Sequence, residues 1–201
     1  KRINYYLPFV IIGVFFFQII ASPLIYMFFL IEKTDLVSVL LFAIVFEIFV
    51  YTNFCGLSLI IYGIFGIFGY RIPLNFKQPF SSSNVVDFWK GWHTSLSAVL
   101  KVLFYAPLRK KSTQFVALSG VFFASSLWHG LSLNFLIWGV FHTLAFWLSL
   151  VLLRNNIKII PIIVLIVGVI IGRTLSADSD TDRLLEKLIF SYDGTGVLST
   201  F

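Results

Sequence analysis

The sequence predicts an all-α protein that crosses a membrane several times. Among its 201 residues, 59% are hydrophobic and only 12% are charged, whereas soluble domains average about 45–50% apolar and about 25% charged residues. The long runs of Ile, Leu, Val and Phe contain few turn residues and no regular alternation of apolar and polar positions. Such runs favour membrane-spanning helices over a transmembrane β-barrel.

The first two apolar runs are each long enough to cross a bilayer. Residues 5–31 exceed the roughly 20 residues that a spanning helix needs, and Pro23 predicts a kink or break near the end of this run. Residues 36–69 are too many for one straight crossing. We therefore expect the second run to break or tilt near residues 53–56.

A polar stretch separates these runs from the next helix. Residues 70–86 combine Arg, Lys and Gln with Pro, Ser and Asn, and this turn chemistry predicts a segment outside the membrane. Asn84 and the serines before it, residues 81–83, are candidate N-caps for the helix that follows. Asp87 would lie in its first turn, where the helix dipole favours negative charge.

Residues 87–105 are predicted to form an amphipathic helix. Tryptophans and leucines recur at helical spacing along one face, and a separate stripe carries Lys90, His93, Ser97 and Lys101. A helix of this kind lies on the membrane surface or lines the mouth of a cavity.

The rest of the chain is predicted to return to the membrane. Residues 112–131 and 134–153 each form one expected crossing, and their very short connection makes them antiparallel neighbours. A further apolar run covers residues 159–172. Residues 178–190 are expected to form an amphipathic helix at the interface.

The charges predict an orientation in the cell membrane. If the crossings alternate, the N-terminus, residues 70–112 and the turn 154–158 share one side and hold most of the Lys and Arg residues. The positive-inside rule assigns that side to the cytoplasm. These loops account for the net charge of +6, so we expect a multi-pass membrane protein with membrane lipid, and no nucleic acid, among its partners.

A Trp-His-Gly step at residues 128–130 places a histidine within an apolar segment. An ionisable side chain at that depth is by default a functional-site hypothesis. Ser125 and Ser126 lie one helical turn before His129 on the same face. A neutral imidazole with a pKa near ~6.5 can accept a proton from an attacking hydroxyl and return it. We therefore predict that His129 is the general base.

The next crossing carries a second polar face, formed by Asn134, Trp138 and His142. Because the two crossings are antiparallel neighbours, His142 and His129 are expected to share one polar cavity. Structural roles remain open for every histidine: His129 as a hydrogen-bonded packing residue, His142 as a donor to a backbone carbonyl, and His93 as part of a plain interfacial helix.

Several other chemistries have no signature in the sequence. It contains no Gly-x-Ser-x-Gly elbow, no His-Glu-x-x-His zinc pair and no Walker loop. Its single cysteine, Cys55, excludes an internal disulfide and leaves too little sulfur for a thiolate metal site. The spacing of the three histidines is not that of metal ligands, so we predict no metal and no bound cofactor.

Five segments of the sequence form an ordered set of motifs. They are residues 51–58 (YTNFCGLS), 69–76 with Pro79-Phe80, 87–97 (DFWKGWHTSLS), 127–130 (LWHG) and 138–142 (WGVFH). Together they resemble those of the membrane-bound O-acyltransferase family. The closer likeness is to its bacterial branch, which includes the alginate O-acetylation protein and the D-alanyl transfer protein of teichoic acids. The sequence departs from that branch at Asn53, Leu59 and Lys90-Gly91.

The resemblance implies a polytopic fold with interfacial and re-entrant helices around a central tunnel. Residues 1–201 are then one membrane-embedded acyltransferase domain, incomplete at both ends because family members are longer. By position in the motifs, His129 and His93 are implied to be catalytic. Lys90 and Lys101 are expected on the donor side. The residues expected to line the substrate tunnel are Asn53, Trp92, Ser97, Ser125, Ser126, Trp128, Asn134, Trp138 and His142.

The function that this resemblance implies is transfer of an acyl group, most simply acetyl. The donor is a cytoplasmic thioester, either acetyl-CoA or an acyl-carrier phosphopantetheine, and the acceptor is a hydroxyl of a cell-envelope polysaccharide or glycolipid. A carrier protein or an extracytoplasmic acyltransfer partner is a further expected partner. Two alternatives stay open: a transporter or channel subunit with histidines as a proton relay, and a non-catalytic scaffold of an envelope complex.

Overall fold

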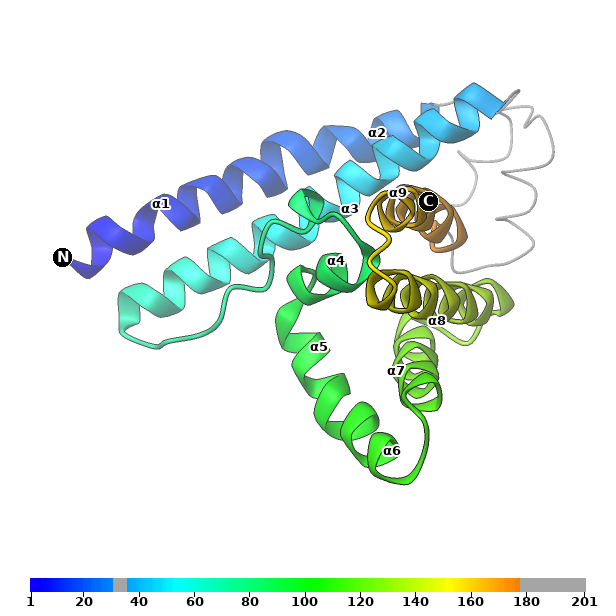
Figure 1. Cartoon of the computed structure of the whole chain (residues 1–201). Coiled ribbons are helices and arrows are strands. Elements are labelled where there is room, and N and C mark those ends of the chain that lie inside the picture. The colour runs from blue at the N-terminus through cyan, green and yellow to red at the C-terminus, as the bar shows by residue number, and fades with distance from the viewer. Residues whose placement is uncertain (31–35, 178–201) are drawn as a thin grey trace.

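The computed structural model describes residues 1–30 and 36–177, and within these ranges every regular element is a helix (Figure 1). The predicted all-α class is therefore confirmed. Within the described ranges, three helices are long and apolar enough to cross a membrane: Arg2–Tyr26, Leu40–Phe68 and Leu133–Arg154. This supports the expected multi-pass membrane protein. The amphipathic helix expected at residues 178–190 lies outside the described residues.

The first apolar run forms one continuous rod. It consists of α1 (Arg2–Val14), a π-helical stretch η1 (Phe15–Ala21) and α2 (Ser22–Leu30). The π-helical stretch ends two residues before Pro23, which has no N–H to donate to the preceding turn. The wider helical turn accommodates the proline. Pro23 is therefore preceded by a π-bulge where the sequence had suggested a kink or break.

The second run, α3 (Leu36–Phe68), is one unbroken helix of 33 residues. The helix does not break near residues 53–56, where the sequence had suggested a break or a tilt. Gly56 instead allows two helices to pack closely. A Cβ at Gly56 would lie 2.8 Å from the carbonyl oxygen of Gly13, so the missing side chain lets α1 and α3 cross closely. At 1.5 Å per residue, α3 is about 50 Å long. It must therefore tilt within, or extend beyond, a hydrocarbon core of ~30 Å.

The polar loop after α3 turns back along that helix instead of remaining outside. Asn75 Nδ2 donates to Ser58 Oγ at 3.4 Å, and the Phe80 ring lies 4.8 Å from the ring of Tyr51, near the middle of α3. The short helices η2 (Pro79–Ser81) and α4 (Val85–Gly91) follow at this depth. Residues 70–86 are thus re-entrant, because their aromatic side chains pack against the spanning helix.

Among the candidates, Asn84 is the N-cap of α4. Its Oδ1 accepts a hydrogen bond from the backbone N–H of Asp87 at 2.9 Å, and its Nδ2 donates to Asp87 Oδ2 at 2.8 Å. Lys90 Nζ lies 2.8 Å from the other Asp87 oxygen. These bonds from Lys90 and Asn84 lower the pKa of Asp87. The charged carboxylate therefore reinforces the start of the helix.

The expected amphipathic helix 87–105 is interrupted. After α4 the chain turns at Trp92 and His93, and α5 (Thr94–Leu100), a π-helical stretch η3 (Lys101–Tyr105) and α6 (Ala106–Lys111) follow. His93 has φ +45° and ψ +60°, the left-handed conformation that ends one helix and begins the next. Pro107 follows η3 at the same spacing as Pro23 follows η1. The same steric cause explains both π-helical stretches.

The last three helices are α7 (Gln114–His129), α8 (Leu133–Arg154) and α9 (Ile159–Leu175). As predicted, α7 and α8 are antiparallel, and Arg154 Nη2 donates to Gln114 Oε1 where they meet. With 16 residues, α7 is about 24 Å long. It is therefore too short to form the complete crossing expected for residues 112–131.

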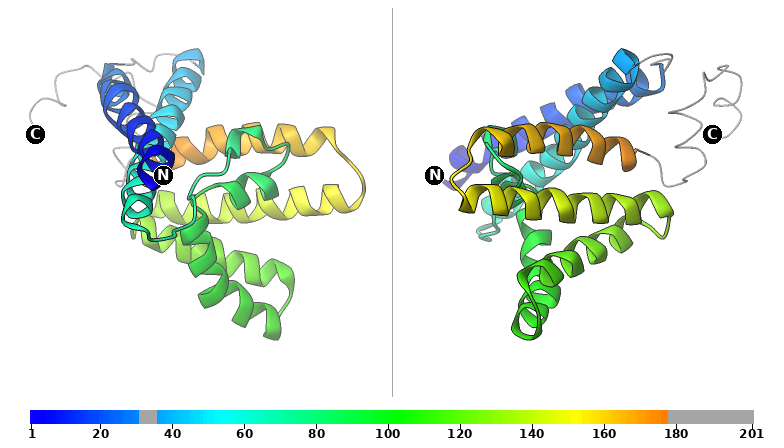
Figure 2. Two further views of the ribbon diagram at one scale, coloured as in Figure 1. Left: turned by 90° about the vertical axis from the view of Figure 1, so that its left-hand side faces the viewer. Right: turned by 45° about the vertical axis from the view of Figure 1, so that its right-hand side comes forward.

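The ends of α1 and α3 meet, whereas α9 crosses α3. A Cβ at Gly69 would meet the guanidinium of Arg2, so the start of α1 lies beside the end of α3. Leu165 of α9 belongs to the apolar cluster on which Tyr51 of α3 packs, and Ala177 packs against the cluster of Phe42. Figure 2 shows α8 and α9 running side by side in opposite directions, with their axes crossing that of α3 at a steep angle. The turn between α8 and α9 lies far from the N-terminus in the left-hand view of Figure 2, so the shared side of the basic segments stays a prediction.

Candidate active site

The re-entrant helices and the α7–α8 pair enclose a cavity of about 420 Å³. One wall comes from α4, α5 and η3, the opposite wall comes from α7 and α8, and α3 contributes Val50 and Phe54. The lining side chains that carry a polar group are Trp89, Lys90, Trp92, His93, Ser97, Lys101, Tyr105, Gln114, Ser125, Trp128, His129 and Trp138. Both histidines of the two family-like motifs therefore reach one space.

His129 is the last residue of α7, and its ring is exposed to the cavity. Aromatic rings hold it: it stacks on Phe135 at 5.7 Å and meets Trp138 edge-on at 5.1 Å. Gly130 follows with φ +157° and donates its N–H to Ser126 O at 3.1 Å. A Cβ at this glycine would lie 2.9 Å from the Phe135 ring. The Gly of the Trp-His-Gly step therefore leaves space for the ring on which His129 stacks.

His93 enters the cavity from the opposite wall. It is the N-cap of α5, and its Nδ1 accepts the backbone N–H of Leu96 at 3.3 Å. Its ring is half-buried between Phe76, 6.1 Å away, and Trp128, 6.4 Å away. Burial lowers the pKa of His93 below its usual range. The side chain is therefore predominantly neutral at physiological pH.

The two lysines expected on the donor side both line the cavity and are both exposed. Lys90 is paired with Asp87, so its charge is partly balanced. Lys101 lies at the start of η3, about two helical turns beyond His93 on the same wall. The cavity therefore combines two imidazoles with cationic side chains.

Five of the nine residues expected along the tunnel line this cavity, and four do not. The five are Trp92, Ser97, Ser125, Trp128 and Trp138. Ser126 instead donates its hydroxyl to Phe122 O at 2.8 Å, and Asn134 donates Nδ2 to Leu175 O at 3.0 Å. Asn53 lies on α3 between two lining residues but outside the lining itself. These polar groups support helix packing.

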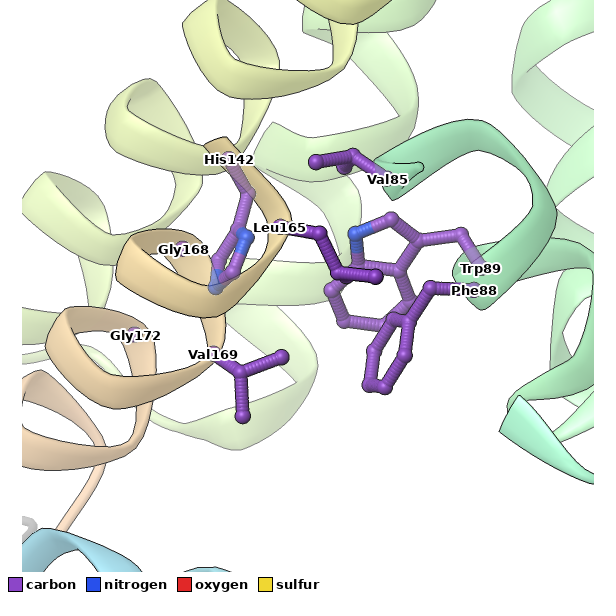
Figure 3. A pocket seen from close by; sticks show the side chains of 8 residues that line it. All are labelled: Val85, Phe88, Trp89, His142, Leu165, Gly168, Val169 and Gly172. Atoms are coloured by element: carbon purple, nitrogen blue, oxygen red, sulfur yellow. The ribbon is translucent and has the colours of Figure 1, made fainter. Parts of the chain in front are cut away.

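His142, the fourth residue outside the lining, does not share a cavity with His129. Trp138 stands between the two rings, 5.1 Å from His129 and 4.5 Å from His142. His142 lies instead beside a separate pocket of about 10 Å³. Figure 3 shows its ring against α9 beside Gly168 and Gly172, with Trp89 and Phe88 across the gap. The expected shared polar face is divided by an aromatic side chain.

Among the cavity-lining residues that carry a polar group, three were not expected at the site from the sequence: Trp89, Tyr105 and Gln114. Tyr105 extends the stripe of residues 90, 93, 97 and 101 by one helical turn, so spacing could have identified it. Trp89 lines both the large cavity and the small pocket of His142. Gln114 begins a separate helix and carried no such signal. No group of His, Cys, Asp or Glu able to hold a metal occurs among residues 1–30 and 36–177.

Together, the fold and the site define a multi-pass helical membrane protein with a histidine-lined cavity. The sequence profile of the membrane-bound O-acyltransferase family matches residues 5–159. The chain belongs to this family.

Three similar proteins are known by name. The chain is 35% identical over 101 residues to the peptidoglycan O-acetyltransferase of Helicobacter pylori, covering 48% of this chain and 19% of that protein. It is 35% identical to the "Probable alginate O-acetylase AlgI" of Pseudomonas fluorescens, covering 50% and 21%. It is 30% identical to the teichoic acid D-alanyltransferase of Bacillus subtilis, covering 51% and 29%. The matches thus span less than a third of each relative.

Proposed function

We propose that the protein transfers an acyl group, most simply acetyl, from a thioester donor to a hydroxyl of a cell-envelope polysaccharide or glycolipid. The observation that carries this proposal is the cavity into which His129 and His93 project from opposite walls, within a chain of this family. The names of the relatives support the reaction class, since they describe an O-acetyltransferase, an O-acetylase and a D-alanyltransferase.

In the proposed reaction His129 acts as the general base. The acceptor hydroxyl attacks the thioester carbonyl carbon while its proton passes to His129. The tetrahedral intermediate then collapses, the carbon–sulfur bond breaks, and the departing thiolate takes the proton back from the imidazolium. The ring stacking on Phe135 and Trp138 supports this role because it fixes the imidazole at the cavity surface.

The charge distribution supports entry of an anionic donor near Lys90 and Lys101. Acetyl-CoA and acyl-carrier phosphopantetheine both carry phosphate, which lysine binds as a point charge. Under the positive-inside rule, the basic ends of α1, α3 and α8 lie in the cytoplasm. A thioester donor would therefore arrive from the cytoplasm, and no bound cofactor is needed, since the donor is itself a substrate.

The test is transfer of labelled acyl groups by the full-length protein in membranes, with the wild type compared with His129→Ala. Loss of a general base typically slows transfer about 10²–10⁴-fold. His142→Gln serves as the control, because it alters a buried imidazole outside the cavity. Its rate per amount of folded protein should stay close to that of the wild type.

Two results would contradict the proposal. Label that crosses the membrane without becoming attached to glycan would indicate transport. A His129→Ala variant that acylates glycan at the wild-type rate would indicate a scaffold or a different base.

A further inference from the structure

The backbone at His93 is held in an unusual conformation. Its φ of +45° is uncommon for a residue with a side chain. The two residues that follow are fixed by the loop before α4: Thr94 N–H donates to Asn75 O at 2.9 Å, and Ser95 N–H donates to Asn75 Oδ1 at 3.1 Å. Strained residues of this kind persist only where their surroundings determine them fully, and they gather at functional sites.

The hydrogen bonds of His93 fix the position of its proton. Nδ1 accepts the backbone N–H of Leu96 at 3.3 Å, and the hydroxyl of Ser95 lies 3.5 Å from the same nitrogen. An amide N–H only donates, so Nδ1 must carry the lone pair. In a neutral imidazole the proton is then on Nε2. The edge of the ring that remains for the cavity therefore presents a donor.

This tautomer separates the roles of the two histidines. A neutral His93 has no free lone pair on the cavity side, because its only lone pair is engaged by the start of α5. It cannot accept the acceptor's proton without giving up the cap. A fixed N–H donor in a partly buried cavity is the kind of group that stabilises a developing oxyanion.

We propose that His93 is the oxyanion donor of the reaction: its Nε2–H hydrogen-bonds the acyl carbonyl oxygen while His129 takes the proton. This inference rests on the proposed acyl transfer. Attack of the hydroxyl oxygen converts the carbonyl oxygen to an oxyanion, which accepts the hydrogen bond from Nε2 without proton transfer. When the carbon–sulfur bond breaks, the carbonyl re-forms and the hydrogen bond weakens again.

Two substitutions separate the cap from the donor. Asn tolerates the left-handed conformation and is a good N-cap, so His93→Asn keeps the start of α5 but has no group at the position of Nε2. Gln is longer and carries an amide N–H near that position, but it does not provide the cap. Comparing the two variants therefore distinguishes loss of the N-cap of α5 from loss of the N–H donor at the position of Nε2.

For full-length His93→Asn, we expect a wild-type amount of folded protein and a kcat lowered about 10²–10³-fold, with little change in KM. The loss should be uniform across pH, because the acid limb of the pH–rate profile would belong to His129. His93→Gln should retain more kcat per folded molecule than His93→Asn, although its stability is lower.

Two results would overturn the inference. One is a His93→Asn variant with the wild-type kcat, and the other is disappearance of the acid limb, which would make His93 the base. Either result, in a protein that still needs His129 to acylate glycan, leaves the proposed acyl transfer intact. If the wild type transfers no acyl group, the proposed function fails together with this inference.

Discussion

His93 shows how one side chain can serve both folding and chemistry. Its Nδ1 caps α5, and its ring lines the cavity that His129 also reaches. A positive φ is uncommon for residues with a side chain, although histidine adopts it more often than most, and such residues gather at functional sites. The neighbouring contacts from Asn75 to Thr94 and Ser95 hold this conformation in place.

The lowered pKa of His93 predicts that protein stability depends on pH. Burial holds the pKa of the folded state below the unfolded value of 6.5. Below pH 6.5 the unfolded chain therefore binds more protons than the folded chain. The stability that neutral His93 contributes is present above this pH and is lost as the pH falls through the folded-state pKa.

Thermal unfolding in detergent checks this dependence. Between about pH 7.5 and about pH 5, the wild type should lose stability more steeply than His93→Asn, which has no titrating group at this position. Equal slopes for the two proteins would show that His93 titrates in the folded state as it does in the unfolded chain.

At the scale of helices, glycines decide where backbones approach. Gly56 lets α1 and α3 cross closely, whereas Gly172 of α9 accommodates the imidazole of His142 from α8. A Cβ at Gly172 would overlap that ring, but a Cβ at Gly168, one turn earlier on α9, would meet nothing within 4 Å. Figure 3 shows both glycines beside His142. The packing of α9 on α8 therefore requires the absence of a side chain at Gly172 but not at Gly168.

The two glycines make a matched pair for mutation. Gly172→Ala should destabilise the protein by about 1–3 kcal/mol, because overpacking forces α9 or the His142 ring to move. Gly168→Ala should be neutral or stabilising by up to about 1 kcal/mol, since alanine favours the helix. Unfolding of both variants in detergent gives these values.

A double substitution identifies the clash. His142→Ala removes the ring, so adding Gly172→Ala to it should cost much less than Gly172→Ala costs in the wild type. Equal costs in the two backgrounds would mean that the clash is not with His142.

At the scale of the whole molecule, the basic segments predict the topology in the membrane. Tyr70 follows α3 and Asn155 follows α8, each beside basic residues, while Leu131, 89% exposed, precedes the start of α8. The positive-inside rule makes the segments after α3 and after α8 cytoplasmic. The only native cysteine, Cys55, is buried and can be replaced by alanine to give a cysteine-free background.

Single cysteines in this background test the orientation. In intact cells, a membrane-impermeant maleimide should label Leu131→Cys but label Tyr70→Cys and Asn155→Cys only after the membrane is opened. Opposite labelling of Tyr70→Cys and Asn155→Cys would contradict the prediction that the segments after α3 and after α8 share the cytoplasmic side.

The sequence alone determined the class of fold and the antiparallel pairing of α7 and α8, and it placed Asn84 among the candidate caps. These features follow from composition, hydrophobic period and short connections, all of which are local properties of the chain. Its ordered motifs also indicated the family. They identified His93 and His129 as the pair of interest before the cavity was known.

The tertiary structure decided which polar residues share a space. Spacing put His142 and Asn134 with His129 and Ser126 on facing helices, but Trp138 divides that face and Ser126 bonds within its own helix. The loop that re-enters along α3 fixed the break at His93, so one expected helix became two. A cavity forms where side chains from distant segments leave space between them. The sequence of one helix does not determine which side chains of other helices pack against it.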